Sequence, residues 1–138
     1  MIIINASREM SAPIDRIWSV VADVDNEPTY WRGTKTVKYI YKAANKIERE
    51  VTIAFKDSKC RQTVLLHPKK SVEIIITQGP IRGTKTVLLN PLDNHNTRID
   101  IVWNLKLTGF LGLFASIVKR HIVEGTDEAL LRIAKAVE

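Results

Sequence analysis

The chain has 138 residues, of which 45% are hydrophobic and 26% charged, and its formal net charge is +6. This length fits one domain spanning residues 1–138 and excludes a second domain with a core of its own. The composition, with only 6 Gly and 5 Pro, excludes a disordered or collagen-like chain. The one cysteine, Cys60, cannot form an internal disulfide, so the sequence predicts a protein of the reducing cytoplasmic compartment.

The first thirty residues predict a strand followed by a short helix. Apolar residues alternate over residues 2–10, as in a strand with one buried face. Ser11 and Pro13 then provide a helix start, and the apolar residues of 14–22 recur at helical spacing. Residues 23–31 predict a connector with room for one further helical turn.

Residues 34–107 show the pattern of consecutive strands. Short apolar alternations are separated by turns of two to six residues. This predicts six strands joined as an antiparallel meander, because parallel neighbours need long crossovers. The alternation is weakest over residues 81–90, and the inward-facing phase of that strand stays open.

After Gly109 the apolar period becomes 3.6 residues and predicts a helix of more than six turns. The elements together predict an α+β fold: a seven-stranded, curved antiparallel sheet gripping a long C-terminal helix, with one or two short helices after the first strand. The longest uncharged stretch runs from Leu107 to Val118 and is well short of the roughly 20 residues that a membrane-spanning helix needs, so we expect no membrane span.

One hexapeptide occurs twice. Residues 32–37, RGTKTV, recur letter for letter as residues 82–87. Two copies are too few for a repeat architecture. The favoured interpretation is two hairpins with similar structural demands, and the alternative is an anion contact shared by the paired Arg and Lys side chains.

The residues that carry most enzyme chemistry are scattered. His67, His95 and His121 stand on different predicted elements, without a second His or Cys three or four residues away, which argues against a metal site. Cys60 lies in the apolar phase of a strand and is more typical of a small buried side chain than of an activated thiol. The sequence therefore predicts no metal, no cofactor and no identifiable catalytic residue.

Several segments resemble one superfamily. They are the opening segment SAPIDRIWSVVADVDNEPTYW, the segments VTIAFKD and ITQGPIRGTKTVLLNPLDNHNTRIDIVWNLKL, and the closing helix after Gly109 and Gly112. These are similar to the START-like, or helix-grip (SRPBCC), superfamily, and most of all to its coenzyme-Q-binding and polyketide-cyclase branch. The resemblance covers nearly the whole chain and implies a single START-like domain that holds an apolar ligand between sheet and helix. The superfamily shares no catalytic motif, so the resemblance does not name the ligand.

The phases of the strands and the helix predict which side chains face that space. We expect the ligand to contact ten residues: Arg49, Val51, Ile53, Phe55, Gln62, Ile101, Trp103, Phe114, Val118 and His121. Most of them are apolar, which favours binding or carriage of a small hydrophobic molecule such as a lipid, an isoprenoid quinone or a polycyclic metabolite. The alternative function is that of a polyketide cyclase or dehydratase, an enzyme that acts chiefly by positioning its substrate.

Arg49 is the cation in the inward phase of its strand, since it alternates with Ile47, Val51 and Ile53. An inward guanidinium needs an acceptor. It can anchor the polar end of an apolar ligand, reach solvent at the end of the sheet, or belong to an ion pair within the protein.

A basic stretch leads to a third hypothesis. Its cations include Arg32, Lys35, Lys38 and Lys42, with Tyr39 and Tyr41 between them and no acidic residue. Such a stretch is compatible with weak nucleic-acid or ribosome contact, because tyrosines stack on unpaired bases. We favour a solvated edge strand with its tyrosines toward the core, since exposed lysines commonly protect a sheet edge.

Overall fold

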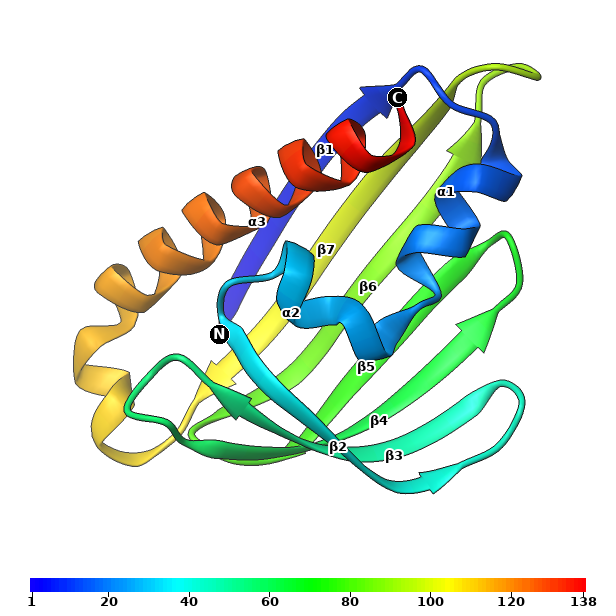
Figure 1. Ribbon diagram of the computed structural model, residues 1–138. Coiled ribbons are helices and arrows are strands. Elements are labelled where there is room, and N and C mark those ends of the chain that lie inside the picture. The colour runs from blue at the N-terminus through cyan, green and yellow to red at the C-terminus, as the bar shows by residue number, and fades with distance from the viewer.

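The computed structural model describes residues 1–138, and its seven strands form one antiparallel sheet (Figure 1). The strands are β1 (Ile2–Met10), β2 (Thr34–Lys42), β3 (Lys46–Ile53), β4 (Lys59–His67), β5 (Ser71–Gln78), β6 (Ile81–Pro91) and β7 (Thr97–Leu107). Their order across the sheet is β1-β7-β6-β5-β4-β3-β2, so β2 to β7 form a meander and β1 pairs with β7. The predicted seven-stranded α+β fold is confirmed.

Three helices lie on one face of the sheet (Figure 1). The first, α1 (Ile14–Val21), follows β1, and a 3₁₀ turn at Val24–Asn26 leads into the single-turn α2 (Glu27–Tyr30). These are the short helices predicted after the first strand. The third, α3 (Ala115–Val137), has 23 residues. No helix of the protein is both long and apolar enough to cross a membrane.

The two halves of α3 pack differently. Buried residues occur only in its C-terminal half, at helical spacing: Thr126, Ala129, Leu130, Ile133, Ala134 and Val137. The apolar ones among them mostly join the core formed by the inward side chains of the sheet. The N-terminal half has no buried residue. Helix and sheet are therefore in close contact at one end of α3 and apart at the other.

The long helix begins later than its sequence pattern predicts. A 3₁₀ segment, Gly109–Phe114, precedes α3, and Gly109 has φ +58°, a backbone conformation that favours glycine. Because a 3₁₀ helix has three residues per turn, the apolar positions do not keep the α-helical face. Leu111 is buried, whereas Phe110 and Phe114 are exposed and lie with their ring centroids 5.6 Å apart.

The phase of β6, which the sequence left open, is settled by the structure: Lys85, Val87 and Leu89 face inward and are buried. Gly83 shares this phase with φ +132°, and a Cβ there would lie 2.0 Å from the carbonyl oxygen of Asn104 on β7. Only glycine fits at this position. At Gly33, the matching glycine of the other hexapeptide copy, a Cβ would meet nothing within 4 Å. The two copies therefore do not have the similar structural demands that we expected.

The edge strand β2 departs from expectation as well. Tyr39 and Tyr41 are 39% and 57% exposed, so the prediction that they face the core is wrong. The cause is irregular pairing: the register with β3 shifts between Thr34 and Thr36 and again between Tyr39 and Tyr41. Each shift breaks the strict alternation on which the prediction depended.

Candidate functional site

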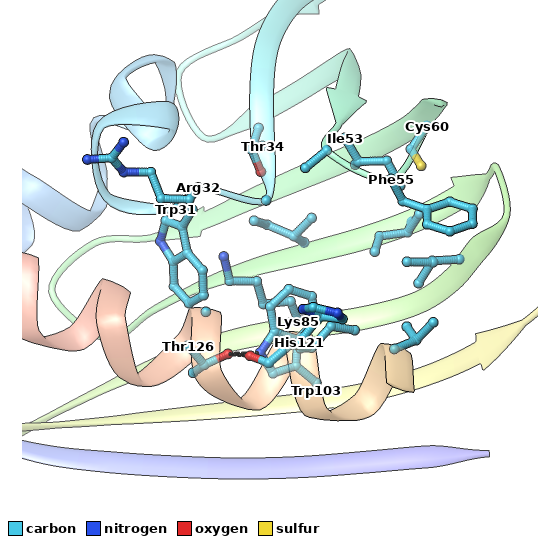
Figure 2. A pocket seen from close by; sticks show the side chains of 18 of the residues that line it. Trp31, Arg32, Thr34, Ile53, Phe55, Cys60, Lys85, Trp103, His121 and Thr126 are labelled. Carbon is cyan, nitrogen blue, oxygen red and sulfur yellow. Dashed lines mark hydrogen bonds between the residues drawn. The ribbon is translucent and has the colours of Figure 1, made fainter. Parts of the chain in front are cut away.

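A cavity of about 550 Å³ opens where α3 stands apart from the sheet (Figure 2). Strands β3 to β7 contribute to its floor, and its walls come from α2, the segment after α2, and α3. Twelve of its 23 lining residues are hydrophobic. Both volume and lining are those of a small-molecule site, for which about 300–1,000 Å³ is usual.

Six of the ten residues predicted to contact a ligand line this cavity: Ile53, Phe55, Gln62, Trp103, Val118 and His121. Figure 2 shows Ile53, Phe55, Trp103 and His121 around the same space, although they come from distant parts of the sequence. Strand alternation and helical spacing thus correctly predicted that these six side chains lie around one space. Their contact with a ligand stays a prediction.

The other four, Arg49, Val51, Ile101 and Phe114, do not line it. Val51 and Ile101 point inward as expected, but both are completely buried and belong to the hydrophobic core. Phe114 is 41% exposed, because the 3₁₀ segment before α3 turns Leu111 inward in its place.

Arg49 faces inward, and the protein itself satisfies its guanidinium. Its Nη2 forms an ion pair with Glu27 Oε1 at 2.9 Å, its Nε donates to Gln62 Oε1 at 2.9 Å, and its Nη1 donates to the Val24 carbonyl oxygen at 3.2 Å. Glu27 in turn accepts a hydrogen bond from Thr34 Oγ1 at 3.0 Å. Of the alternatives for Arg49, the structure shows the ion pair within the protein; the side chain neither enters the cavity nor reaches solvent.

Lys85 is the buried cation of the cavity. Its side chain rises from β6 between two indole rings (Figure 2), with Nζ 3.1 Å from the ring centroid of Trp31 and 5.0 Å from that of Trp103. The two rings meet edge to face at 6.0 Å. A cation near aromatic faces is stabilised by their electrons, by about 2 kcal/mol where water is excluded.

Burial and neighbouring charges shift the pKa values here. Loss of water around Lys85 lowers its pKa, attraction by Glu27 raises it, repulsion by Arg49 lowers it, and the outcome is a pKa of about 8. Burial raises the pKa of Glu27, but the positive charges of Lys85 and Arg49, together with hydrogen bonds from Arg49 and Thr34, outweigh it and hold that pKa below the ordinary value. Burial also raises the pKa of the Cys60 thiol, with a smaller opposing effect from a backbone hydrogen bond at Ile81, so Cys60 remains a protonated, buried side chain.

A hydrogen-bonded link holds α3 over the cavity. Trp103 Nε1 on β7 donates to Thr126 Oγ1 on α3 at 3.0 Å, and Thr126 Oγ1 donates to the Ile122 carbonyl oxygen at 2.6 Å. Thr126 is buried and is the first buried residue of α3. The link therefore stands where close packing of the helix ends and the cavity begins.

Sequence reasoning missed Lys85, Trp31, Glu27 and Thr126 as site residues. The inward orientation of Lys85 could have been predicted, since it alternates with Val87 and Leu89. The apolar pattern of that strand was too weak to show which phase faces inward. A signal existed for Thr126, which lies three residues before the buried Ala129. Trp31 and Glu27 belong to the connector after α1, and no periodicity orients their side chains.

The basic stretch is partly neutralised by acidic side chains. Lys35 forms an ion pair with Asp57, and Lys42 lies 3.6 Å from Asp25. Lys42 Nζ also donates to the Tyr39 hydroxyl at 3.1 Å. These contacts belong to a solvated edge strand, and the findings do not support a nucleic-acid or ribosome contact.

A curved sheet that grips a long helix around an apolar cavity defines the START-like, helix-grip class of proteins. The chain belongs to the family described as "Polyketide cyclase / dehydrase and lipid transport", which it matches over residues 1–138. The predicted superfamily is thereby confirmed. A search of curated proteins found no match.

Solved structures share the fold at low sequence identity. One is a protein from Thermus thermophilus, with a TM-score of 0.81 and 17% identity, covering 99% of this chain and 97% of that one. Another is the Zhui aromatase/cyclase from a Streptomyces strain, with a TM-score of 0.71, 17% identity and coverage of 99% and 90%. A third is the di-domain aromatase/cyclase BexL, with a TM-score of 0.72 and 17% identity. The match covers 99% of this chain and 46% of BexL.

Proposed function

We propose that the protein binds a small hydrophobic molecule in the cavity between the sheet and α3, in contact with Ile53, Phe55, Trp103 and Val118. The observation that carries this proposal is the apolar space of about 550 Å³ that the side chains leave unfilled. Had the same side chains filled the space, the fold alone would give no reason to expect a ligand. The family's description, which includes lipid transport, agrees with this function.

The lining suits an apolar body with few polar groups. Isoleucine side chains come from β3, β5 and β6, and flat indole rings come from Trp31 and Trp103. A lipid acyl chain, an isoprenoid quinone or a polycyclic aromatic molecule would each remove such a surface from water, which is favourable at about 25 cal/mol per Å² of apolar area.

Native mass spectrometry of protein purified without delipidation tests the proposal. We expect a fraction of the protein to carry an extra mass that extraction with organic solvent removes. Val118→Trp places an indole in the cavity and should reduce the bound fraction. Lys119→Trp, one position further along α3 and exposed, is the matched control and should not. A bound fraction that responds equally to both changes would contradict binding in this cavity.

A second candidate function is that of a cyclase or dehydratase. The observation that favours it is that an amine, Lys85, and an imidazole, His121, line the same cavity and are groups that can transfer protons. An enzyme of this kind would hold a poly-β-ketone chain in a folded conformation and speed its ring closure by positioning. We expect a synthetic poly-β-ketone thioester to give an aromatic absorbance faster with the wild-type protein than with His121→Ala. Equal rates in both proteins and in buffer would leave binding as the function.

A further inference from the structure

Lys85 carries a positive charge in the cavity wall that the protein leaves without a hydrogen-bond acceptor. The residue is 4% exposed. It takes part in none of the side-chain hydrogen bonds or ion pairs of the protein, whereas the neighbouring Arg49 makes three. Every polar side-chain atom sealed from solvent has a partner, so the unpartnered Nζ of Lys85 is not sealed, and Figure 2 shows Lys85 among the side chains that line the cavity. Indole faces stabilise the charge but accept no conventional hydrogen bond.

The charges around the cavity floor do not balance. Arg49 and Lys85 supply two positive charges and Glu27 one negative charge, all three on buried residues. Both carboxylate oxygens of Glu27 are already engaged, Oε1 by Arg49 and Oε2 by Thr34. One buried positive charge is therefore left for a partner that the chain does not provide. Burying a charge is costly unless the charge is paired and hydrogen-bonded.

We propose that the ligand is an apolar molecule bearing one carboxylate, and that this carboxylate binds the Lys85 ammonium between Trp31 and Trp103. This inference rests on the proposed function and narrows it to a class of ligand. A single carboxylate supplies the one negative charge that balances the buried group, and its oxygens accept the free N–H donors of Lys85.

The rest of the cavity argues against a phosphate or other multiply charged head. Bidentate phosphate recognition uses an arginine fork, and the guanidinium of Arg49 is committed to the protein. The acidic side chains Glu124 and Glu128 also line the α3 side of the cavity. Arg32 lines the cavity too, but Figure 2 shows its guanidinium pointing away from Lys85, so a second negative charge on a head group bound at Lys85 would meet these carboxylates rather than a cation.

The test compares two pairs of probes that differ only in charge: dodecanoic acid with dodecanol, and 2-naphthoic acid with 2-naphthalenemethanol. Binding is measured by calorimetry with delipidated protein at neutral pH. We expect the acid of at least one pair to bind about tenfold or more tightly than its alcohol. Lys85→Met should abolish this preference by weakening the acid alone. Lys35→Met, at the same place in the other hexapeptide copy but exposed and paired with Asp57, is the matched control and should keep the preference.

The wild-type protein provides a second measurement that needs no variant. Since the pKa of Lys85 is about 8, raising the pH from about 7 to about 10 should weaken binding of the acid and leave the alcohol unchanged. The other charged or titratable side chains beside Lys85 or around the cavity are Glu27, Arg32, Arg49, His121, Glu124 and Glu128, with the Cys60 thiol. A pH effect due to any of these would persist in Lys85→Met, and in that case the assignment to Lys85 is overturned.

The possible failures differ. If each acid binds as well as its alcohol, or keeps its preference in Lys85→Met, the carboxylate proposal is wrong while binding in the cavity stands. If none of the four probes binds, the proposed function and the carboxylate proposal fail together.

Discussion

Replacing Lys85 with methionine should make the ligand-free protein more stable at neutral pH. Methionine has a similar length and no charge, so it can occupy the space between the two indole rings. The wild-type chain must keep an ammonium group in a place where burial and repulsion by Arg49, partly offset by attraction to Glu27, lower its pKa from 10.5 to about 8. Each pKa unit corresponds to about 1.4 kcal/mol, so the charge costs about 3 kcal/mol at pH 7.

This cost already includes the attraction to Glu27. It does not include the attraction of the ammonium to the rings of Trp31 and Trp103, about 2 kcal/mol, which methionine gives up. We therefore expect a net gain of about 1 to 3 kcal/mol in the free energy of unfolding, measured by urea denaturation of delipidated protein at pH 7. Lys35→Met, at an exposed lysine, should stay within about 0.5 kcal/mol of wild type.

The pH dependence of stability tests independently whether the charge on Lys85 destabilises the folded protein. Between about pH 8 and 10.5 the unfolded chain holds a proton on Lys85 that the folded chain has lost. The stability of the wild type should therefore rise with pH across this window relative to Lys85→Met, and the advantage of the variant should shrink. A variant that is less stable at pH 7, or an advantage that does not change up to pH 10.5, would refute this account of Lys85.

Other substitutions test the remaining contacts by urea denaturation. Gly83→Ala should cost about 3 kcal/mol or more because its Cβ would lie 2.0 Å from a carbonyl oxygen of β7, while Gly33→Ala, with open space around it, should cost less than about 0.5 kcal/mol. Arg49→Met leaves Glu27 buried without its partner and should cost about 3 to 5 kcal/mol; a stable variant with weakened ligand binding would show that Arg49 serves the ligand instead. Thr126→Val removes the hydrogen bond between α3 and β7 and should cost about 1 kcal/mol, with a shift in tryptophan fluorescence; unchanged stability and emission would show that this bond does not hold the helix.

Periodicity predicted the elements because it is a local property. The alternation of apolar residues along β3 was enough to predict that Arg49 faces inward. The short turns were enough to predict an antiparallel meander. The partner of Arg49 could not be found in the same way. Glu27 lies 22 residues earlier, in a one-turn helix whose position over the sheet depends on the closure of the whole fold. The prediction that Phe114 lines the cavity failed for a related reason. The pattern of apolar residues does not show where 3₁₀ geometry changes to α-helical geometry.

The repeated hexapeptide shows how far local sequence can decide function. Lys35 and Lys85 have the same three residues before them and the same two after them. Lys35 lies on the irregular edge strand β2, is exposed and pairs with Asp57. Lys85 lies on β6, a strand with neighbours on both sides, in phase with buried residues and between two indole rings. The same six residues thus produce a solvated surface charge in one place and a desolvated, unpartnered ammonium in the other. What distinguishes them is the neighbours that the fold brings from β7 and from the segment after α2, so the chemistry of this cavity is a property of the closed sheet and not of any motif in the sequence.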